Sequence, residues 1–165
     1  KDWIRDDLSG QDALLSELIT DARAIAENYL RRAVATQTLA LHLDLFPEVI
    51  QVPRPPLQSI SSIEYVDADG ATQTLSASAY RADTNSDPGR ITPAWGESWP
   101  TTRCVTGAVT VTYVAGYTSC PSPIKRAIAR IVADQERYRG DIVSSGPAEI
   151  SMSAKALLSP YRTWL

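Results

Sequence analysis

Few side chains in the sequence could carry out catalysis at neutral pH. His42 is the one histidine among 165 residues, so it is the one imidazole that could exchange a proton near pH 7. It lies within a stretch where apolar and polar residues alternate, and nothing beside it in the sequence resembles an activated nucleophile. We interpret His42 as a surface or interface residue.

Metal and phosphate chemistry have equally little support. Cys104 and Cys120 lack the spacing of metal ligands, and we expect both to be reduced. Asp67, Asp69 and Gly70 resemble the start of a calcium loop, but the later ligands and the distal glutamate are missing, so a hairpin turn is predicted. The chain has no glycine-rich phosphate loop, G-x-S-x-G or H-E-x-x-H motif. The sequence therefore predicts no cofactor, no metal and no enzymatic activity. The remaining enzymatic alternative is a hydrolase built on unrecognised carboxylates, which would require perturbed pKa values.

The composition is that of a globular chain. At 18.0 kDa, with 44% hydrophobic and 21% charged residues, the chain is long enough to bury a core without a disulfide or a metal. No apolar stretch approaches the ~20 residues of a membrane-spanning helix, and no secretion signal opens the chain. The net charge of −3 disfavours tight nucleic-acid binding through bulk charge.

Hydrophobic periodicity predicts helices near both ends of the chain. Residues 9–32 repeat apolar side chains at helical spacing. A second helix is expected from Ser122, because serine followed by proline is typical of a helix start, to residue 139. A short helix over residues 151–158 precedes the C-terminal tail.

Between the helices, a two-residue repeat of apolar side chains predicts strands. The expected strands cover residues 36–45, 49–52, 60–66, 72–75, 80–82, 90–92 and 105–114. The fold class is therefore α+β, with an N-terminal amphipathic helix, a central antiparallel β-sheet with hairpins, a second long helix, and a short C-terminal helix with an extended tail. We expect a single α+β domain over residues 1–139. Residues 140–165 are expected to form a flexible segment, the short helix and a docking tail.

The two long helices carry opposite charges. Residues 6–32 have a net charge of −3, and residues 124–139 have a net charge of +3. Two helices packed within one subunit, each with a solvated outer face, account for this pattern. Complementary faces that meet between copies in a head-to-tail ring account for it as well. In the second interpretation, the contacts between subunits involve Glu17, Asp21, Arg126, Arg130 and Arg137.

Aromatic residues mark two further candidate contact regions. The tail contains Tyr161, Arg162 and Trp164, which are residue types common at interface hot spots. It could reach a neighbouring protein or fold back on its own domain. Trp95 and Trp99 lie in a loop rich in turn-forming residues, where the same two interpretations apply. If the chain is instead a β-rich binding module, these two tryptophans would recognise a peptide or a sugar.

The order of several short motifs along the chain is distinctive. The series runs through Pro53-Arg54-Pro55-Pro56-Leu57-Gln58-Ser59-Ile60, Tyr65-Val66-Asp67-Ala68-Asp69-Gly70, Tyr80, Gly89-Arg90-Ile91, Trp99-Pro100, Ala108-Val109-Thr110-Val111-Thr112-Tyr113-Val114-Ala115-Gly116-Tyr117, Pro123-Ile124-Lys125 and Leu157-Leu158-Ser159-Pro160-Tyr161-Arg162. From about residue 7 to the C-terminus, this series resembles the head–tail connector (adaptor) family of tailed double-stranded DNA bacteriophages and phage-derived gene transfer agents.

The resemblance implies a structural virion protein that is made in the bacterial cytoplasm. Such adaptors form a ring, commonly of twelve copies, between the portal and the stopper or tail. DNA passes through the axial channel without sequence-specific binding, and no membrane is involved. The resemblance also implies that the C-terminal segment docks on the portal, through Tyr161, Arg162, Trp164 and Leu165. Trp95 and Trp99 would then contact a neighbouring ring.

Overall fold

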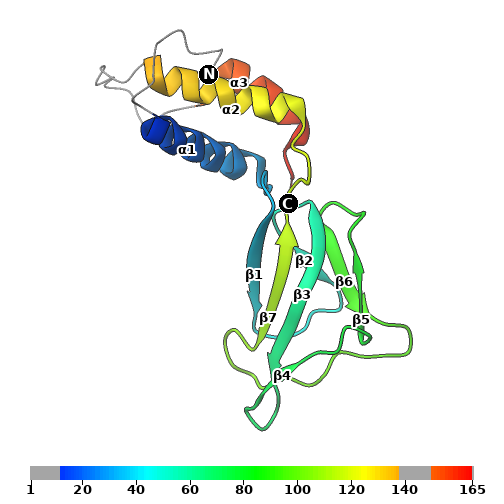
Figure 1. Cartoon of the computed structure of the whole chain (residues 1–165). Helices are drawn as coiled ribbons and strands as arrows, with labels where there is room; N and C mark the ends of the chain where they lie inside the picture. The colour runs from blue at the N-terminus through cyan, green and yellow to red at the C-terminus, as the bar shows by residue number, and fades with distance from the viewer. Residues whose placement is uncertain (1–11, 138–149, 165) are drawn as a thin grey trace. The chain divides into compact units, whose positions relative to one another are not determined.

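The computed structural model describes residues 12–137 and 150–164. Its internal contacts divide the chain into two compact units. The helical unit contains the described residues up to Leu30 and those from Ser119 to Trp164, and the strand unit contains Arg31–Thr118 (Figure 1). Helices and antiparallel sheets together confirm the α+β class. The single domain expected over residues 1–139 stays a prediction.

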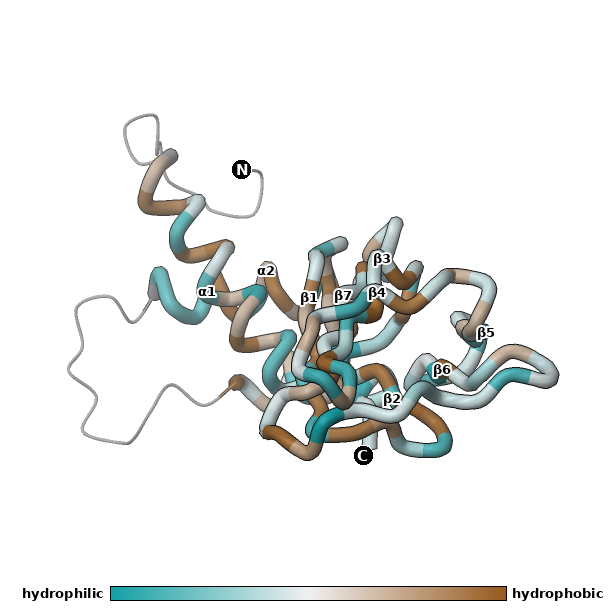
Figure 2. Tube along the Cα trace, turned by 90° about the horizontal axis from the view of Figure 1, so that it is seen from below, coloured by the Kyte–Doolittle hydropathy of each residue, from teal (hydrophilic) through white to brown (hydrophobic). Residues whose placement is uncertain are grey.

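The helical unit is built from amphipathic helices. These are α1 (Asp12–Leu30), α2 (Ser122–Arg137) and α3 (Met152–Leu158), with a 3₁₀ turn η1 (Ser159–Tyr161) after α3. Helix α2 packs against both α1 and α3. Hydrophobic and hydrophilic residues recur along the length of both α1 and α2 (Figure 2), as expected for helices with one apolar and one polar face. The fully buried side chains include Ala22, Ala26, Leu30, Ile124, Ala127, Ala154 and Leu158.

The predicted helices are confirmed, with corrected ends. Helix α1 ends at Leu30 instead of residue 32, because Arg31 has a φ of 55° and so takes the left-handed conformation that commonly terminates helices. Helix α2 begins at the predicted Ser122. The expected start of the first helix at residues 9–11 and end of the second at 138–139 lie outside the described residues, as does most of the segment 140–150 that was expected to be flexible.

The strand unit contains two antiparallel sheets. The strands are β1 (Gln37–Leu43), β2 (Ile50–Val52), β3 (Leu57–Val66), β4 (Thr72–Thr74), β5 (Tyr80–Asp83), β6 (Gly89–Pro93) and β7 (Val109–Ala115). The larger sheet has the order β1-β7-β3-β4 and the smaller sheet the order β2-β6-β5 (Figure 1). The core contains buried side chains from both sheets, among them Ile50, Val52, Ile63, Ile91, Val109, Val111 and Tyr113.

The predicted two-residue alternation is confirmed in β1 and β7, but both strands are shorter than expected. Along β1, residues from Gln37 alternate between half-buried and exposed. The expected strand extended to residue 45, yet 62% of Leu45 is exposed, because β1 ends at Leu43. Strand β7 begins at Val109 instead of residue 105, since Gly107 has a φ of 70° that breaks the extended backbone. The Gly107 amide donates to the Asp44 carboxylate at 2.7 Å.

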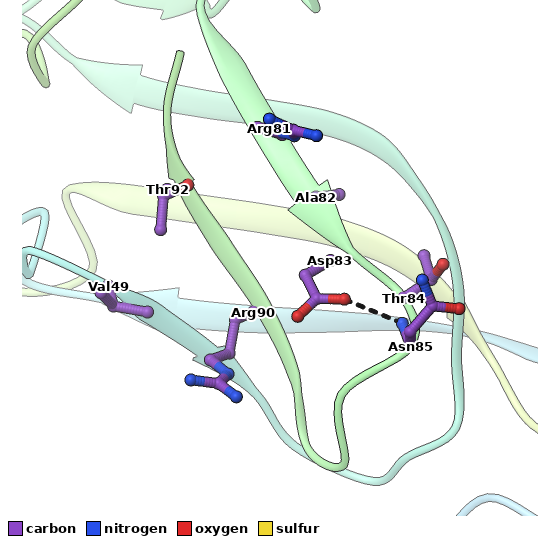
Figure 3. Close-up of a pocket in the computed structure, with 8 residues that line it drawn as sticks. All are labelled: Val49, Arg81, Ala82, Asp83, Thr84, Asn85, Arg90 and Thr92. Carbon is purple, nitrogen blue, oxygen red and sulfur yellow. Dashed lines mark hydrogen bonds between the residues drawn. The ribbon is translucent and has the colours of Figure 1, made fainter. Parts of the chain in front are cut away.

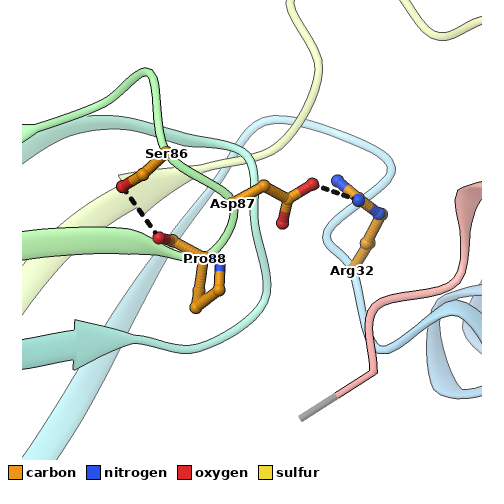
Figure 4. A network of polar contacts seen from close by, with 4 residues as sticks. All are labelled: Arg32, Ser86, Asp87 and Pro88. Carbon is orange, nitrogen blue, oxygen red and sulfur yellow. Dashed lines mark hydrogen bonds and ion pairs between the residues drawn. The ribbon is translucent and has the colours of Figure 1, made fainter.

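Polar contacts hold the first residues and the turns of the strand unit. Arg32 forms an ion pair with Asp87, and Ser86 Oγ donates to the Pro88 carbonyl at 2.9 Å (Figure 4). The hydroxyl of Tyr113 donates to the Pro53 carbonyl at 3.0 Å. Burial raises the pKa of this tyrosine.

The predicted turn at residues 67–70 is confirmed. The Asp67 carboxylate accepts hydrogen bonds from the amides of Asp69, at 3.0 Å, and Ala71, at 2.9 Å. Gly70 has a φ of 91°, which favours glycine in such a turn. A hydrogen bond from the Gln73 side chain is the largest cause of the lowered pKa of Asp67, followed by the bond from the Ala71 amide. The carboxylate thus organises a hairpin turn through side-chain-to-backbone bonds.

Candidate functional site

The residues considered for catalysis do not form a catalytic arrangement. His42 is exposed on β1, and its Nδ1 lies 3.1 Å from the Thr110 hydroxyl. Cys104 is exposed and Cys120 is half-buried, and both are free thiols. Within residues 12–137 and 150–164, no group of three His, Cys, Asp or Glu side chains could hold a metal ion.

A hollow of about 490 Å³ lies on the smaller sheet (Figure 3). Its lining includes Arg81 and Asp83 of β5 and Arg90 of β6. The Asp83 carboxylate accepts a hydrogen bond from the Asn85 amide at 3.0 Å, and this bond is the largest cause of its lowered pKa. A lowered pKa keeps this carboxylate ionised, which is the opposite of what a general acid at neutral pH needs. The hollow is therefore a charged surface without an evident catalytic acid.

The C-terminal tail is held against α1. The Thr163 amide donates to the Leu30 carbonyl at 3.0 Å, and only 6% of Thr163 is exposed. The Arg162 guanidinium lies 5.1 Å from the centre of the Tyr29 ring and 4.4 Å from that of Trp164, a double cation–π arrangement. Trp164 itself is 76% exposed. Part of the predicted docking tail therefore packs on its own unit, while its last described aromatic side chain faces solvent.

The other residues of the predicted docking tail provide less evidence for a contact with a partner. Tyr161 ends η1 and is half-buried, whereas Leu165 lies outside the described residues. Arg162 Nε and Thr163 Oγ1 are buried and have no hydrogen-bond partner among the described residues. Portal docking by this segment stays a prediction.

The two tryptophans of the predicted contact loop have different environments. Trp99 stacks on Phe46 with ring centres 4.8 Å apart and an interplanar angle of 6°. Its indole nitrogen donates to the Glu48 carbonyl at 3.4 Å. Trp95 is fully exposed in a tight turn, where the Glu97 amide donates to the Ala94 carbonyl. Only Trp95 thus offers both ring faces to a partner, whether that is a neighbouring ring or the sugar of the alternative hypothesis.

The charged residues predicted to join subunits are exposed on the helices. Glu17 and Asp21 are four residues apart and share one face of α1, and Arg126 and Arg130 do the same on α2. None of these four forms an ion pair with another residue in the described part of the chain. The side chain of Arg137 lies outside the described residues. Helices α1 and α2 pack together, yet these four charges are left for solvent or a partner.

Sequence reasoning did not identify the unpaired edges of the larger sheet. Strand order places β1 at one edge and β4 at the other. Neither strand contains a proline or a charged residue, and this was the only signal available in the sequence. The hollow between Arg81 and Arg90 was also not identified, because it depends on the pairing of β5 with β6.

The fold is similar to that of chains in gene transfer agent particles. One match, from the neck of an empty particle computed with C6 symmetry, has a TM-score of 0.77 and 23% identity, covering 95% of this chain and 81% of the other. A second, from the neck of a native particle computed with C12 symmetry, has a TM-score of 0.75 and 24% identity, covering 93% and 84%. A third, from the virion of a native particle, has a TM-score of 0.78 and 22% identity, covering 98% and 83%. This chain therefore shares the fold of these particle proteins.

Comparisons with protein-family models and with curated proteins found no match. None of the helices in the described residues has the length and apolar character needed to cross a bilayer.

Proposed function

We propose that this chain is a structural, non-enzymatic subunit of the neck of a tailed phage or gene transfer agent particle. The observation that carries the proposal is the fold similarity, which covers 93–98% of the chain at TM-scores of 0.75–0.78. The motif series noted in the sequence points to the same class of protein. In this role the chain forms a ring, and the C12 symmetry applied to one matched neck suggests twelve copies.

The exposed charges support contacts between copies. A closed ring of identical subunits needs two different, complementary surfaces on each subunit. Glu17 and Asp21 on α1 supply an acidic face, and Arg126 and Arg130 on α2 supply a basic face. Charges of this kind chiefly set the orientation and the rate of association, since exposed pairs contribute little stability.

The exposed aromatic residues support contacts along the axis of the particle. Trp164 would bind the portal ring, and Trp95 would contact the stopper or tail protein. Both are large, exposed aromatic side chains, a residue type that is common among interface anchors. DNA would pass through the ring without sequence-specific binding, and the chain's net charge of −3 limits its attraction to phosphates.

Native mass spectrometry of the chain, alone and mixed with the portal ring of the same particle, tests this proposal. We expect a discrete complex with one copy of this chain per portal subunit. A chain that remains monomeric at all concentrations and does not bind the portal would contradict the proposal. Saturable binding of a peptide or sugar by that monomer would then favour the alternative binding module.

A further inference from the structure

The free edges of the larger sheet suggest how neighbouring copies join, an inference that rests on the proposed ring. Strand β1 is seven residues long and forms one edge of the sheet. Its outer side pairs with no other strand in the described residues. Natural proteins usually protect such an edge with charges, proline or a bulge, and none of these occurs in β1.

The hydrogen bonds reveal which β1 residues have free backbone groups. The Val66 amide donates to the Ala108 carbonyl, and the Gly116 amide donates to the Pro56 carbonyl. Even-numbered positions along β7 therefore bond toward β3, and odd-numbered positions bond toward β1, because backbone groups alternate along a strand. Odd-numbered Tyr113 of β7 is paired with Leu39 of β1, so the odd-numbered residues of β1 are the ones that bond to β7. The N–H and C=O groups of Thr38, Ala40 and His42 consequently point to the free edge.

Strand β4 offers a matching edge on the other side of the sheet. The Leu75 amide donates to the Ile63 carbonyl, so odd-numbered positions bond toward β3. The backbone groups of Thr72 and Thr74 therefore point outward. Both threonines are exposed, as are Thr38, Ala40 and His42 of β1. On both edges, then, the residues with free backbone groups have their side chains on the solvent face.

The free edges of β1 and β4 also match in register and in strand direction. Pairing in register connects His42 to Thr110, Thr110 to Glu64 and Glu64 to Thr74. His42 and Thr74 therefore occupy the same register position on opposite edges of the sheet. Because every pairing in the sheet is antiparallel, β4 runs antiparallel to β1. A rotated copy could place its β4 beside β1 and continue the antiparallel sheet, with the solvent faces on the same side.

The edges of the smaller sheet fit less well. Strand β2 is followed by prolines at positions 53, 55 and 56, which lack the backbone donor. Strand β5 carries Arg81 and Asp83. The Ala94 amide donates to the Ala79 carbonyl, so the free backbone groups of β5 belong to Tyr80 and Ala82. Tyr80 packs against the core, so pairing with β1 would join a core face to a solvent face.

We propose that β1 of one copy pairs antiparallel with β4 of the next copy, so that the larger sheets of adjacent subunits form one continuous sheet. Main-chain hydrogen bonds between Thr38–His42 and Thr72–Thr74 join the subunits. The two outward-facing positions of β4 limit the contact to a short ladder. This contact acts together with the side-chain contacts elsewhere in the interface.

Proline substitutions test the pairing. Ala40→Pro removes an outward-facing donor while leaving the hydrogen bonds of Leu39 and Leu41 to β7 in place, and Thr74→Pro does the same on β4. Ala82→Pro is a matched control, because Ala82 has an outward-facing donor on the free edge of the other sheet. We expect the first two variants to raise the concentration needed for half-assembly at least tenfold, and the control to change it less than twofold. Circular dichroism and thermal melting of the monomers verify folding.

Mixing the variants tests the direction of the contact. An Ala40→Pro copy keeps its β4 edge, and a Thr74→Pro copy keeps its β1 edge. At a concentration where each variant alone is monomeric, an equimolar mixture should therefore yield heterodimers in native mass spectrometry. On wild-type assembly, hydrogen exchange should slow at the amides of Ala40 and Thr74 and stay unchanged at Ala82.

The outcomes separate this proposal from that of the ring. A wild-type ring that Ala40→Pro leaves unchanged would overturn the strand pairing and keep the ring. A wild-type chain that never assembles would overturn both. If Ala40→Pro fails to fold, Ala40→Lys replaces it, since a charge at the edge opposes strand addition without removing a donor. Assembly of this lysine variant at wild-type concentrations would then overturn the pairing.

Discussion

Arg162 lies over the ring of Tyr29, with 5.1 Å between the guanidinium carbon and the ring centre. This contact attaches the C-terminal tail to the last turn of α1, next to the hydrogen bond from the Thr163 amide to the Leu30 carbonyl. The same guanidinium also contacts Trp164, which is otherwise exposed. The tail therefore combines residues that hold it in place with one residue available to a partner.

These two roles of the tail can be separated by mutation. Trp164→Ala should lower the free energy of unfolding by less than about 1 kcal/mol, since this largely exposed side chain loses only its contact with Arg162, and should weaken portal binding at least tenfold. Tyr29→Ala should instead reduce the free energy of unfolding by about 1–2 kcal/mol, because it removes the cation–π contact and half-buried ring packing. Thermal melting and a portal pull-down measure the two effects. Unchanged portal binding by Trp164→Ala would contradict the role of Trp164 in docking.

The two tryptophans of the central loop should respond differently to truncation. Trp99→Ala removes the stack on Phe46 and should cost about 2 kcal/mol of unfolding free energy. Trp95→Ala should cost less than about 0.5 kcal/mol, because Trp95 is fully exposed. Urea unfolding measures both values. If Trp95→Ala also leaves binding to the stopper or tail protein unchanged, its proposed contact is wrong.

The acidic face of α1 in one copy should contact the basic face of α2 in the next copy. Arg126→Glu combined with Arg130→Glu should weaken ring assembly at least tenfold, with little change in monomer stability, because neither arginine has an ion-pair partner among the described residues. Adding Glu17→Arg and Asp21→Arg should restore assembly by reversing the partner face. Sedimentation at low and moderate salt measures the effect. An equal loss of monomer stability and assembly would instead favour charge contacts within one subunit.

Gly116 should tolerate no side chain. A Cβ at this position would lie 2.2 Å from the Ala35 carbonyl oxygen, and its φ of 118° is unfavourable for other residues. Gly116→Ala should therefore cost about 3 kcal/mol or more of unfolding free energy. Gly107→Ala is the matched control, since its φ is also positive, at 70°, but nothing lies within 4 Å of the added atom. It should cost about 1–2 kcal/mol, and an equal loss in both variants would show that the close contact is unimportant.

The Asp67 turn should make stability depend on pH in the acid range. Its pKa is lower in the folded chain than the ordinary value of 3.8, so the ionised carboxylate stabilises the fold above that value. This contribution is lost as the pH falls through the lowered pKa. The stability advantage of wild type over Asp67→Asn should therefore shrink between about pH 5 and pH 2, and Gln73→Ala should reduce the same dependence. A constant difference across this range would contradict the assignment.

Much of the secondary structure follows from the sequence alone, because helix and strand repeats are local. The alternation in β1 and the serine–proline start of α2 required no knowledge of distant residues. Strand ends were less predictable. The exposure of Leu45, for example, depends on where β1 stops pairing with β7.

The candidate contact surfaces were also only partly predictable from the sequence. The sequence identified which residue types could bind partners, including the opposite charges of the two long helices and the tryptophans of the loop. It could not separate Trp95 from Trp99, since only packing against Phe46, which is distant in the sequence, covers one of them. The free edges of β1 and β4 were likewise decided by strand order alone. Burial and pairing depend on contacts between residues far apart in the chain, and local sequence patterns do not encode which distant segments will meet.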